Sequence, residues 1–215
     1  DNDFVTWKQN ATLEVTAGMP LIGGANVEVT GDMHQAYLDK IESYYYNAMG
    51  VITEDETVKN LYVAFNKRMR DEVGAKFQLV AHNKAADYEG IVNVKNTVTD
   101  DVYSEQALIY WTTGLIAGCK VNASNLNKIY NGEFDVIADY TQPQLEAAIN
   151  NGEFCLHKVG DSIRVLADIN SLVTVTEDKG GIFKENQTIR VVDQIATDVA
   201  NLFVNNYIGV VPNDS

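Results

Sequence analysis

The sequence has few basic residues. Only 16 Lys and Arg residues stand against 30 Asp and Glu residues in a chain of 215, so the formal net charge is -14. Nucleic-acid-binding domains carry clustered Lys and Arg, and anionic membranes repel acidic surfaces. The charge therefore argues against nucleic acid and against a membrane as partners. It suits a soluble protein, and it also suits contact with a basic surface on a partner or neighbouring subunit.

Cysteine, histidine and long apolar runs are scarce as well. The two cysteines, Cys119 and Cys155, are too few for the disulfide framework of a small secreted domain and suit small apolar positions in a reducing compartment, although a bridge between them stays open. The three histidines have no second ligand at helical spacing, so no zinc site can be predicted. No apolar run reaches the roughly 18 residues that a membrane span needs, and a signal-peptide pattern is missing.

Motifs for catalysis are missing too. There is no G-x-S-x-G sequence around a serine nucleophile. Cys155 and His157 lie two residues apart on a predicted strand, where they share a face, but no oxyanion-binding element accompanies them. The pair Asp100 and Asp101 precedes a predicted helix and suits a cap better than a cation site. We expect no enzyme, no catalytic residue, no metal and no cofactor.

A glycine-rich segment leaves one alternative open. The Gly18–Gly31 loop precedes a predicted helix, an arrangement that can hold a phosphate. Neither a Lys-Ser/Thr pair after Gly31 nor a G-x-G-x-x-G order supports nucleotide binding. The alternative to a structural protein is an α/β enzyme or binding module with a phosphate ligand at this loop. A weaker alternative is a binding module that uses the tyrosines at 44–46.

Hydrophobic periodicity and turn signals predict an α/β fold. We expect a mixed β-sheet flanked by about five α-helices, with a C-terminal β-hairpin followed by a long amphipathic helix. Helices are predicted over 32–49, from the T-E-D-E capping box at 53–56 to Gly74, over 103–118, from the capping box at Thr141 to Asn150, and over 188–208. Strands are predicted over 12–16, 77–81, 90–94, 154–159, 163–169 and 171–176, with the hairpin turn at Gly160-Asp161.

The last predicted helix has a regular apolar stripe. Its members are spaced by three or four residues, which places them on one helical face: Val192, Ile195, Val199, Leu202 and Phe203. We expect this face to be buried.

The segment from Ser162 to Ala196 resembles the C-terminal part of contractile tail sheath proteins, which occur in myophages, prophage elements and phage-tail-like bacteriocins. In that family an R-V-x-x-D-I-N-S-L run leads through a polar loop to an I-R-V-x-D-x-I helix. The matching residues here are Arg164, Val165, Asp168, Ile169, Asn170, Ser171, Leu172, Ile189, Arg190, Val191, Asp193 and Ile195. The glycine-rich loop before the first helix and the Ala117-Gly118 helix end are also similar to the family.

The resemblance implies a structural subunit. Residues 1–31 would be an N-terminal edge segment with the glycine-rich loop, and residues 32–215 a sheath α/β domain of C-terminal type, with the chain cut at both ends. The implied function is to polymerise around an inner tail tube and contract, which drives that tube through a target cell envelope. The implied partners are neighbouring sheath subunits, the inner tube and a baseplate. The implied location is a virion or tail-like particle, assembled in the bacterial cytoplasm and released on lysis.

The family joins its subunits by exchanging β-strands through terminal arms, a form of strand addition. The resemblance places the acceptor edge at the predicted hairpin and the strand after it. The residues expected there are Phe154, Leu156, Arg164, Val165, Asp168, Asn170, Leu172 and Val173. Without complete arms the chain by itself is expected to be monomeric.

Overall fold

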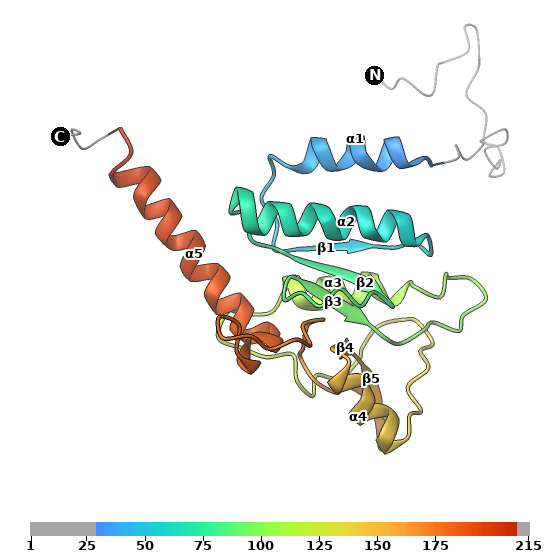
Figure 1. The fold of residues 1–215 in the computed structure, drawn as a ribbon. Helices are drawn as coiled ribbons and strands as arrows, with labels where there is room; N and C mark the ends of the chain where they lie inside the picture. Colours follow the sequence, from blue (N-terminus) through green and yellow to red (C-terminus); the bar gives the residue numbers. More distant parts are fainter. Residues whose placement is uncertain (1–28, 210–215) are drawn as a thin grey trace, which may run out of the picture. The chain divides into compact units, whose positions relative to one another are not determined.

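The computed structural model describes residues 29–209, shown as a ribbon in Figure 1. The chain divides between Thr30 and Gly31, and every element below belongs to the part from Gly31 onward. The predicted strand at 12–16 and nearly all of the Gly18–Gly31 loop lie outside the described residues. The described helices are α1 (Gly31–Ile41), α2 (Glu56–Arg68), α3 (Leu108–Ala117), α4 (Gln142–Asn150) and α5 (Asn186–Asn206), with a π-helical turn at Met69–Val73 and a 3-10 turn at Gly181–Lys184.

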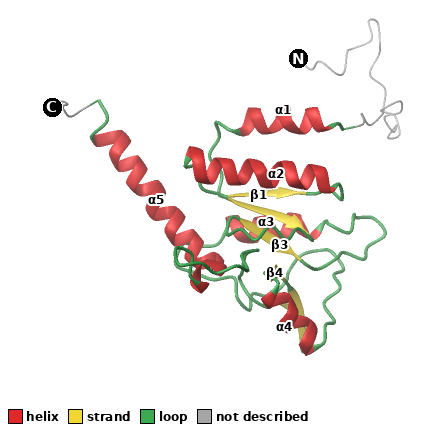
Figure 2. Cartoon of the chain, viewed as in Figure 1, coloured by secondary structure: helices red, strands yellow, loops and turns green. Residues whose placement is uncertain are grey.

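Two sheets accompany these helices, drawn in yellow in Figure 2. Their strands are β1 (Ala48–Val51), β2 (Gln78–His82), β3 (Ile91–Val94), β4 (Glu153–Phe154), β5 (Leu156–Val159) and β6 (Ser162–Val165). The first four form a parallel sheet in chain order, and β5 and β6 form an antiparallel hairpin. The α/β class predicted from the sequence is confirmed.

The parallel sheet is covered on both faces. Successive residues of a strand point to opposite sides, so Leu79 of β2 joins one apolar cluster while Val80 joins the other. The first cluster contains Leu38 of α1 and several side chains of α2, and the second contains Leu108 and Ile109 of α3. Strands buried on both faces read as continuous apolar runs, which is the pattern of β2 and β3.

Local signals place two helices well. Helix α2 begins at Glu56, close to the predicted start, but its cap is Asp55 and not Thr53: the side chain of Asp55 accepts a hydrogen bond from the amide of Thr57 at 2.7 Å. Gly74 adopts a left-handed φ of 88° after the π-helical turn, at the predicted end. In α4 the capping box is formed, because the amide of Thr141 donates to the side chain of Gln144 at 2.8 Å.

The first predicted helix is too long. Helix α1 ends at Ile41, and residues 48–51, expected as its last turn and cap, form β1 instead. A Cβ on Gly50 would collide with the side chains of Thr113 and Ile109 on α3. Gly50 therefore allows close approach of a strand to a helix, a requirement that the local pattern does not reveal.

The region after α4 also differs from the prediction. The hairpin is confirmed, with Gly160 at φ 57° in its turn, but β6 ends at Val165 and not at residue 169. Residues 153–154 pair in parallel with β3, so they belong to the larger sheet. No strand forms at 171–176 in the described structure. There the amides of Val173 and Thr174 donate to the side chain of Asp87, and this polar contact takes the place of a strand ladder.

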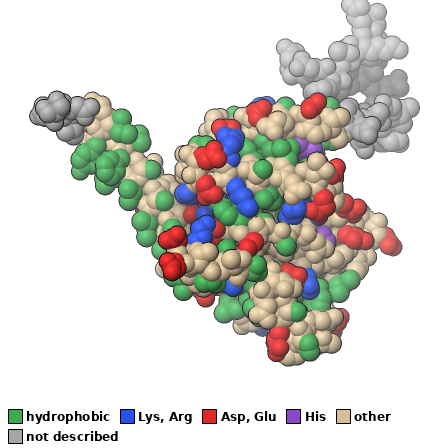
Figure 3. All heavy atoms as spheres, in the orientation of Figure 1, with side chains coloured by type: hydrophobic (Ala, Val, Ile, Leu, Met, Phe, Trp, Pro, Cys, Tyr) green, Lys and Arg blue, Asp and Glu red, His purple; other side chains and the backbone are tan. Residues whose placement is uncertain are grey.

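Helix α5 forms close to its predicted bounds, but its predicted burial is wrong. Only Asn186 and Ile189 are buried, both in its first turn. The five side chains of the apolar stripe are between 42% and 58% exposed. Figure 3 shows this helix extending from the rest of the described part with apolar side chains on its surface. Every residue of α5 from Asp198 to Asn206 is exposed among the described residues.

Candidate assembly surface

Most of the side chains predicted for strand exchange lie inside the protein. Phe154, Leu156 and Val165 belong to the apolar cluster beneath α3. Asp168, Asn170 and Leu172 are buried as well. Of the eight, only Arg164 and Val173 are partly exposed. Burial of six side chains assigns them to packing within the subunit, and a part in strand exchange stays a prediction.

The carboxylate of Asp168 joins three segments of the chain. It accepts hydrogen bonds from Nη2 of Arg190 at 2.7 Å, from the amide of Asn125 at 2.9 Å and from Nδ2 of Asn186 at 3.0 Å. A buried carboxylate is costly unless it is paired and hydrogen-bonded, and here both conditions hold. Asp168 therefore fixes the first turn of α5 and the 124–125 loop to the end of the hairpin region.

The residues that follow Asp168 continue this connection into the parallel sheet. Asn186 accepts a hydrogen bond from Nε2 of Gln78 on β2 at 2.7 Å. Ser171 donates through its amide to the carbonyl of Ile91 on β3 at 2.8 Å and through its hydroxyl to Tyr88 at 2.9 Å. The D-I-N-S-L run is thus a buried polar connector between the sheet and α5.

A second ion pair attaches the same end of α5. Arg70, in the π-helical turn, donates from both terminal nitrogens to the two carboxylate oxygens of Asp193 at 2.8 Å. Burial by itself lowers the pKa of Arg70, but the hydrogen bonds that Arg70 donates to Asp193, together with the negative charge of Asp193, raise it, and the pKa lies above its ordinary value. Arg190 and Asp193 stand one turn apart and hold α5 from two directions.

We name the first turns of α5 with these partners the α5 base: Asp168, Asn186, Ile189, Arg190, Asp193 and Arg70. The motif of the sequence resemblance includes Asp168, Arg190 and Asp193, and of these only Asp168 was expected at a contact between subunits. Arg70 was missed, because it lies 123 residues from Asp193 and no local pattern joins them.

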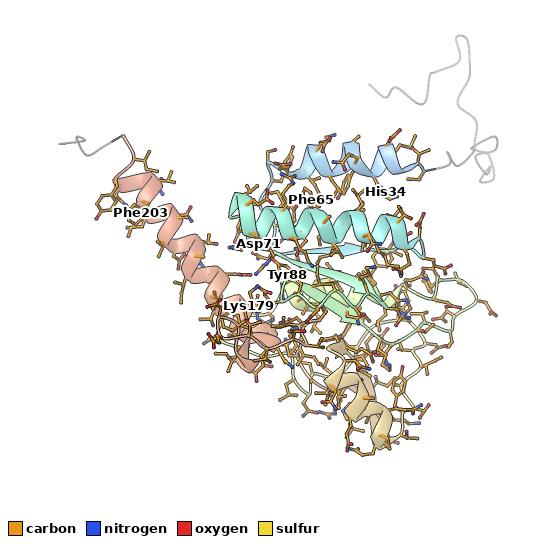
Figure 4. All side chains as sticks on the ribbon, viewed as in Figure 1. His34, Phe65, Asp71, Tyr88, Lys179 and Phe203 are labelled. Atoms are coloured by element: carbon orange, nitrogen blue, oxygen red, sulfur yellow. The ribbon has the colours of Figure 1, made fainter. Side chains whose placement is uncertain are left out.

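A further cluster lies where Lys179 approaches the body, labelled in Figure 4. The ammonium groups of Lys67 and Lys179 lie 5.1 and 5.2 Å from the ring centroid of Tyr88. The Tyr88 hydroxyl donates to Asp71 at 2.7 Å. Burial, followed by this hydrogen bond, raises the pKa of Tyr88. These contacts hold the 177–180 loop against Tyr88. The local sequence pattern did not predict them.

The edges of the hairpin are largely occupied. Along β6 the amide of Asn127 donates to Val165 at 2.9 Å, and the amide of Tyr130 donates to Ile163 at 2.8 Å. Along β5 the side chain of Asn96 bonds both the amide and the carbonyl of Leu156, at 2.7 and 2.8 Å. Among residues 29–209 the strand with an unpaired long edge is β1, whose one strand neighbour is β2.

The chemistry of the remaining candidates is structural. Cys155 is buried between β4 and β5, and burial raises the pKa of its thiol to about 12, so it is protonated at neutral pH and a poor nucleophile. Burial lowers the pKa of His157. Asp100 accepts a hydrogen bond from the amide of Asp135 at 2.7 Å. In the described part of the chain no three potential metal ligands cluster, both cysteines are free, and no helix is long and apolar enough to cross a membrane.

Residues 27–171 match the family described as the phage tail sheath protein central domain. The chain belongs to the phage tail sheath protein family. It is similar to the crystal structure of the sheath tail protein of Desulfitobacterium hafniense, with 36% identity, a TM-score of 0.82, and coverage of 96% of this chain and 50% of that one. It is 29% identical to the tail sheath protein of Clostridium phage phiCD119 over 82% of this chain and 50% of that protein.

The fold also matches a contractile particle. The helical sheath of the anti-feeding prophage, solved in its contracted state, has a TM-score of 0.59 over 84% of this chain and 52% of that chain. The identity is 14%, so the likeness is one of fold. The sheath chain described here spans between 42% and 50% of the length of the curated relatives it matches. The family is a structural one.

Proposed function

We propose that this chain is part of a contractile tail sheath subunit, whose copies polymerise around an inner tail tube and contract to drive the tube through a target cell envelope. The observation that carries the proposal is the family match over residues 27–171 together with the shared fold. The subunit works in a virion or tail-like particle that is assembled in the bacterial cytoplasm and released on lysis. Its further partners are the inner tube and a baseplate.

Neighbouring subunits are joined by strands from terminal arms. Backbone ladders suit this purpose because they hold strands together whatever the side chains, while the arms can bend as subunits slide. The buried members of the predicted set would keep the hairpin and the connector rigid. Arg164 and Val173, the two partly exposed members, are the side chains that an incoming strand would contact. The energy of contraction comes from the lower free energy of the contracted lattice, without nucleotide hydrolysis.

Electron microscopy of negatively stained samples tests this function. The longest product of the reading frame that contains this sequence is compared with the 215-residue chain. We expect tubes from the long product and dispersed particles, monomeric by light scattering, from the chain. Dispersed particles from both, over a range of salt and protein concentrations, would contradict the proposal.

A double variant tests where the arm strand of a neighbouring subunit binds. Arg164→Ala with Val173→Asp should weaken tube formation if an arm strand passes over these side chains. The control is Asp161→Asn, an exposed turn position of the same hairpin. If tubes form equally well from both variants, the acceptor edge lies elsewhere, and the outer side of β1 is the next edge to test.

The alternative of a phosphate ligand at the glycine-rich loop is tested separately. A rise in the melting temperature of the chain with millimolar nucleotide would support it.

A further inference from the structure

The helix α5 carries an exposed apolar face. It is formed by Val192, Ile195, Val199, Leu202 and Phe203, and we name it the α5 stripe. Each of these side chains is 42% exposed or more. Figure 4 shows Phe203 on the outer part of the helix, away from the sheet. The α5 base, in contrast, is buried or partly buried, and its polar members are hydrogen-bonded.

The spacing of the α5 stripe is that of a helix made to pack. Val192, Ile195, Val199 and Leu202 follow one another by steps of three, four and three residues, which keeps them on one face. The opposite face carries polar residues such as Asn201. Helices in proteins owe most of their stability to packing of such a face. We therefore expect the exposed α5 stripe to pack against another apolar surface.

The charges on α5 disfavour a membrane as that cover. Helices that bind anionic lipid surfaces carry Lys and Arg on the polar face. Arg190 is the single basic residue of α5, and it is engaged by Asp168. Asp193 and Asp198 add negative charge, in a chain whose net charge is already -14.

The lengths of the relatives indicate that further sheath polypeptide is available to pack on the α5 stripe. The family match ends at residue 171, before α5 begins, so α5 lies outside the central domain. The curated relatives are about twice as long as the region they share with this chain, which spans 42% to 50% of them. We propose that the α5 stripe packs against a segment of the same sheath polypeptide that lies outside these 215 residues and forms a second apolar core with it.

In this arrangement α5 links two cores. Its base is fixed to the central domain by Asp168 and Arg70, and its stripe would be fixed to the second core, so a movement of one is passed to the other through a continuous helix. The inference rests on membership of the sheath family and on length, and not on contraction. A sheath subunit that fails to form tubes would leave it intact.

Thiol labelling tests the proposal. Val199→Cys and Leu202→Cys report on the α5 stripe, and Asn201→Cys is the matched control on the polar face. The native Cys119 and Cys155 are buried and give little background. Each variant is labelled with a maleimide in the 215-residue chain and in the longest product of the reading frame, both dilute and shown to be monomeric by light scattering. Mass spectrometry of the α5 peptide gives the labelling rate.

We expect the longer product to label about tenfold more slowly at residues 199 and 202, and less than about twofold more slowly at 201, because a packed face reacts only on local opening. Equal rates in the two proteins would overturn the proposal. Protection that appears only as protein concentration rises would also overturn it, since a neighbouring copy would then be the cover. Protection of all three positions alike would do the same, because it would report general shielding in place of a specific face.

Discussion

The two halves of α5 have opposite surroundings, the first buried and hydrogen-bonded and the second exposed. The α5 base has a buried isoleucine and two ion pairs that reach the hairpin region and the π-helical turn. The α5 stripe, which begins only three residues beyond Ile189, has no described partner. One end of this amphipathic helix is held by specific polar contacts, whereas the other carries the apolar face that we propose to pack in a second core. It also separates what holds this chain together from what it offers to the rest of a sheath protein.

The largest expected effect is at the α5 base. Asp168→Ala should lower the free energy of unfolding by about 3–5 kcal/mol, because the side chain of Arg190, which is 10% exposed, loses its carboxylate partner. The control, Asp198→Ala, lies on the exposed part of the same helix and should change it by less than about 0.5 kcal/mol. Urea denaturation followed by circular dichroism measures both. Similar values for the two variants would show that the base is not the anchor.

Substitution of one isoleucine in the α5 base and one in the α5 stripe compares the two halves of the helix without changing its charge. Ile189→Ala should cost about 2–4 kcal/mol, since Ile189 is 2% exposed and leaves a cavity. Ile195→Ala, a 58% exposed position two turns further along, should cost less than about 0.5 kcal/mol in this chain. The midpoints of urea unfolding give the loss of stability in each variant. If Ile195→Ala were as damaging as Ile189→Ala, the stripe would already be packed in this chain.

The second ion pair should matter less than the first. Asp193→Asn should cost about 2 kcal/mol, the usual range for hydrogen bonds to a charged group, because Arg70 keeps its bond to the carbonyl of Phe77 at 2.8 Å. Asp161→Asn, in the exposed hairpin turn, serves as the control. Hydrogen exchange of the α5 amides adds a local measurement, in which the first turns should lose protection. A cost near zero would leave Asp168 as the sole charged anchor.

The smallest effect is the pH dependence of the loop after the connector. Hydrogen bonds from Thr174 and from the amide of Val173 lower the pKa of Asp87 to about 2, below its ordinary 3.8. A depressed carboxylate pKa adds stability above the unfolded value, and this contribution is lost as the pH falls through about 2. Asp87→Asn should therefore differ from the natural chain at pH 5 and differ less at pH 2, in urea midpoints. A gap that widens in acid would contradict this assignment.

Signals contained within one element predicted that element well. The start of α2, the capping box of α4, the glycine turn of the hairpin and the bounds of α5 all depend on residues within a few positions of one another. The family resemblance also came from a continuous run of sequence, and the family is confirmed. Of the residues predicted for strand exchange, Asp168 forms buried contacts within the subunit, while a role of Arg164 between subunits stays a prediction.

Non-local contacts account for what was missed. Gly50 lies in a strand because α3 packs against it, and 171–176 forms no strand because Asp87 takes its amides. Burial of the α5 stripe was predicted from amphipathicity, which shows that a face is suited to packing but not what it packs against. Arg70 and Asp193 meet across 123 residues of sequence.

The α/β class, the capping box of α4 and the sheath family could be predicted from the sequence, because periodicity, capping and motif order are local properties of the chain. The tertiary structure alone decided which polar residues are buried, which strand keeps an open edge, and which half of α5 is anchored. These depend on the free energy of bringing distant segments together, and that energy is set by partners that no local pattern names.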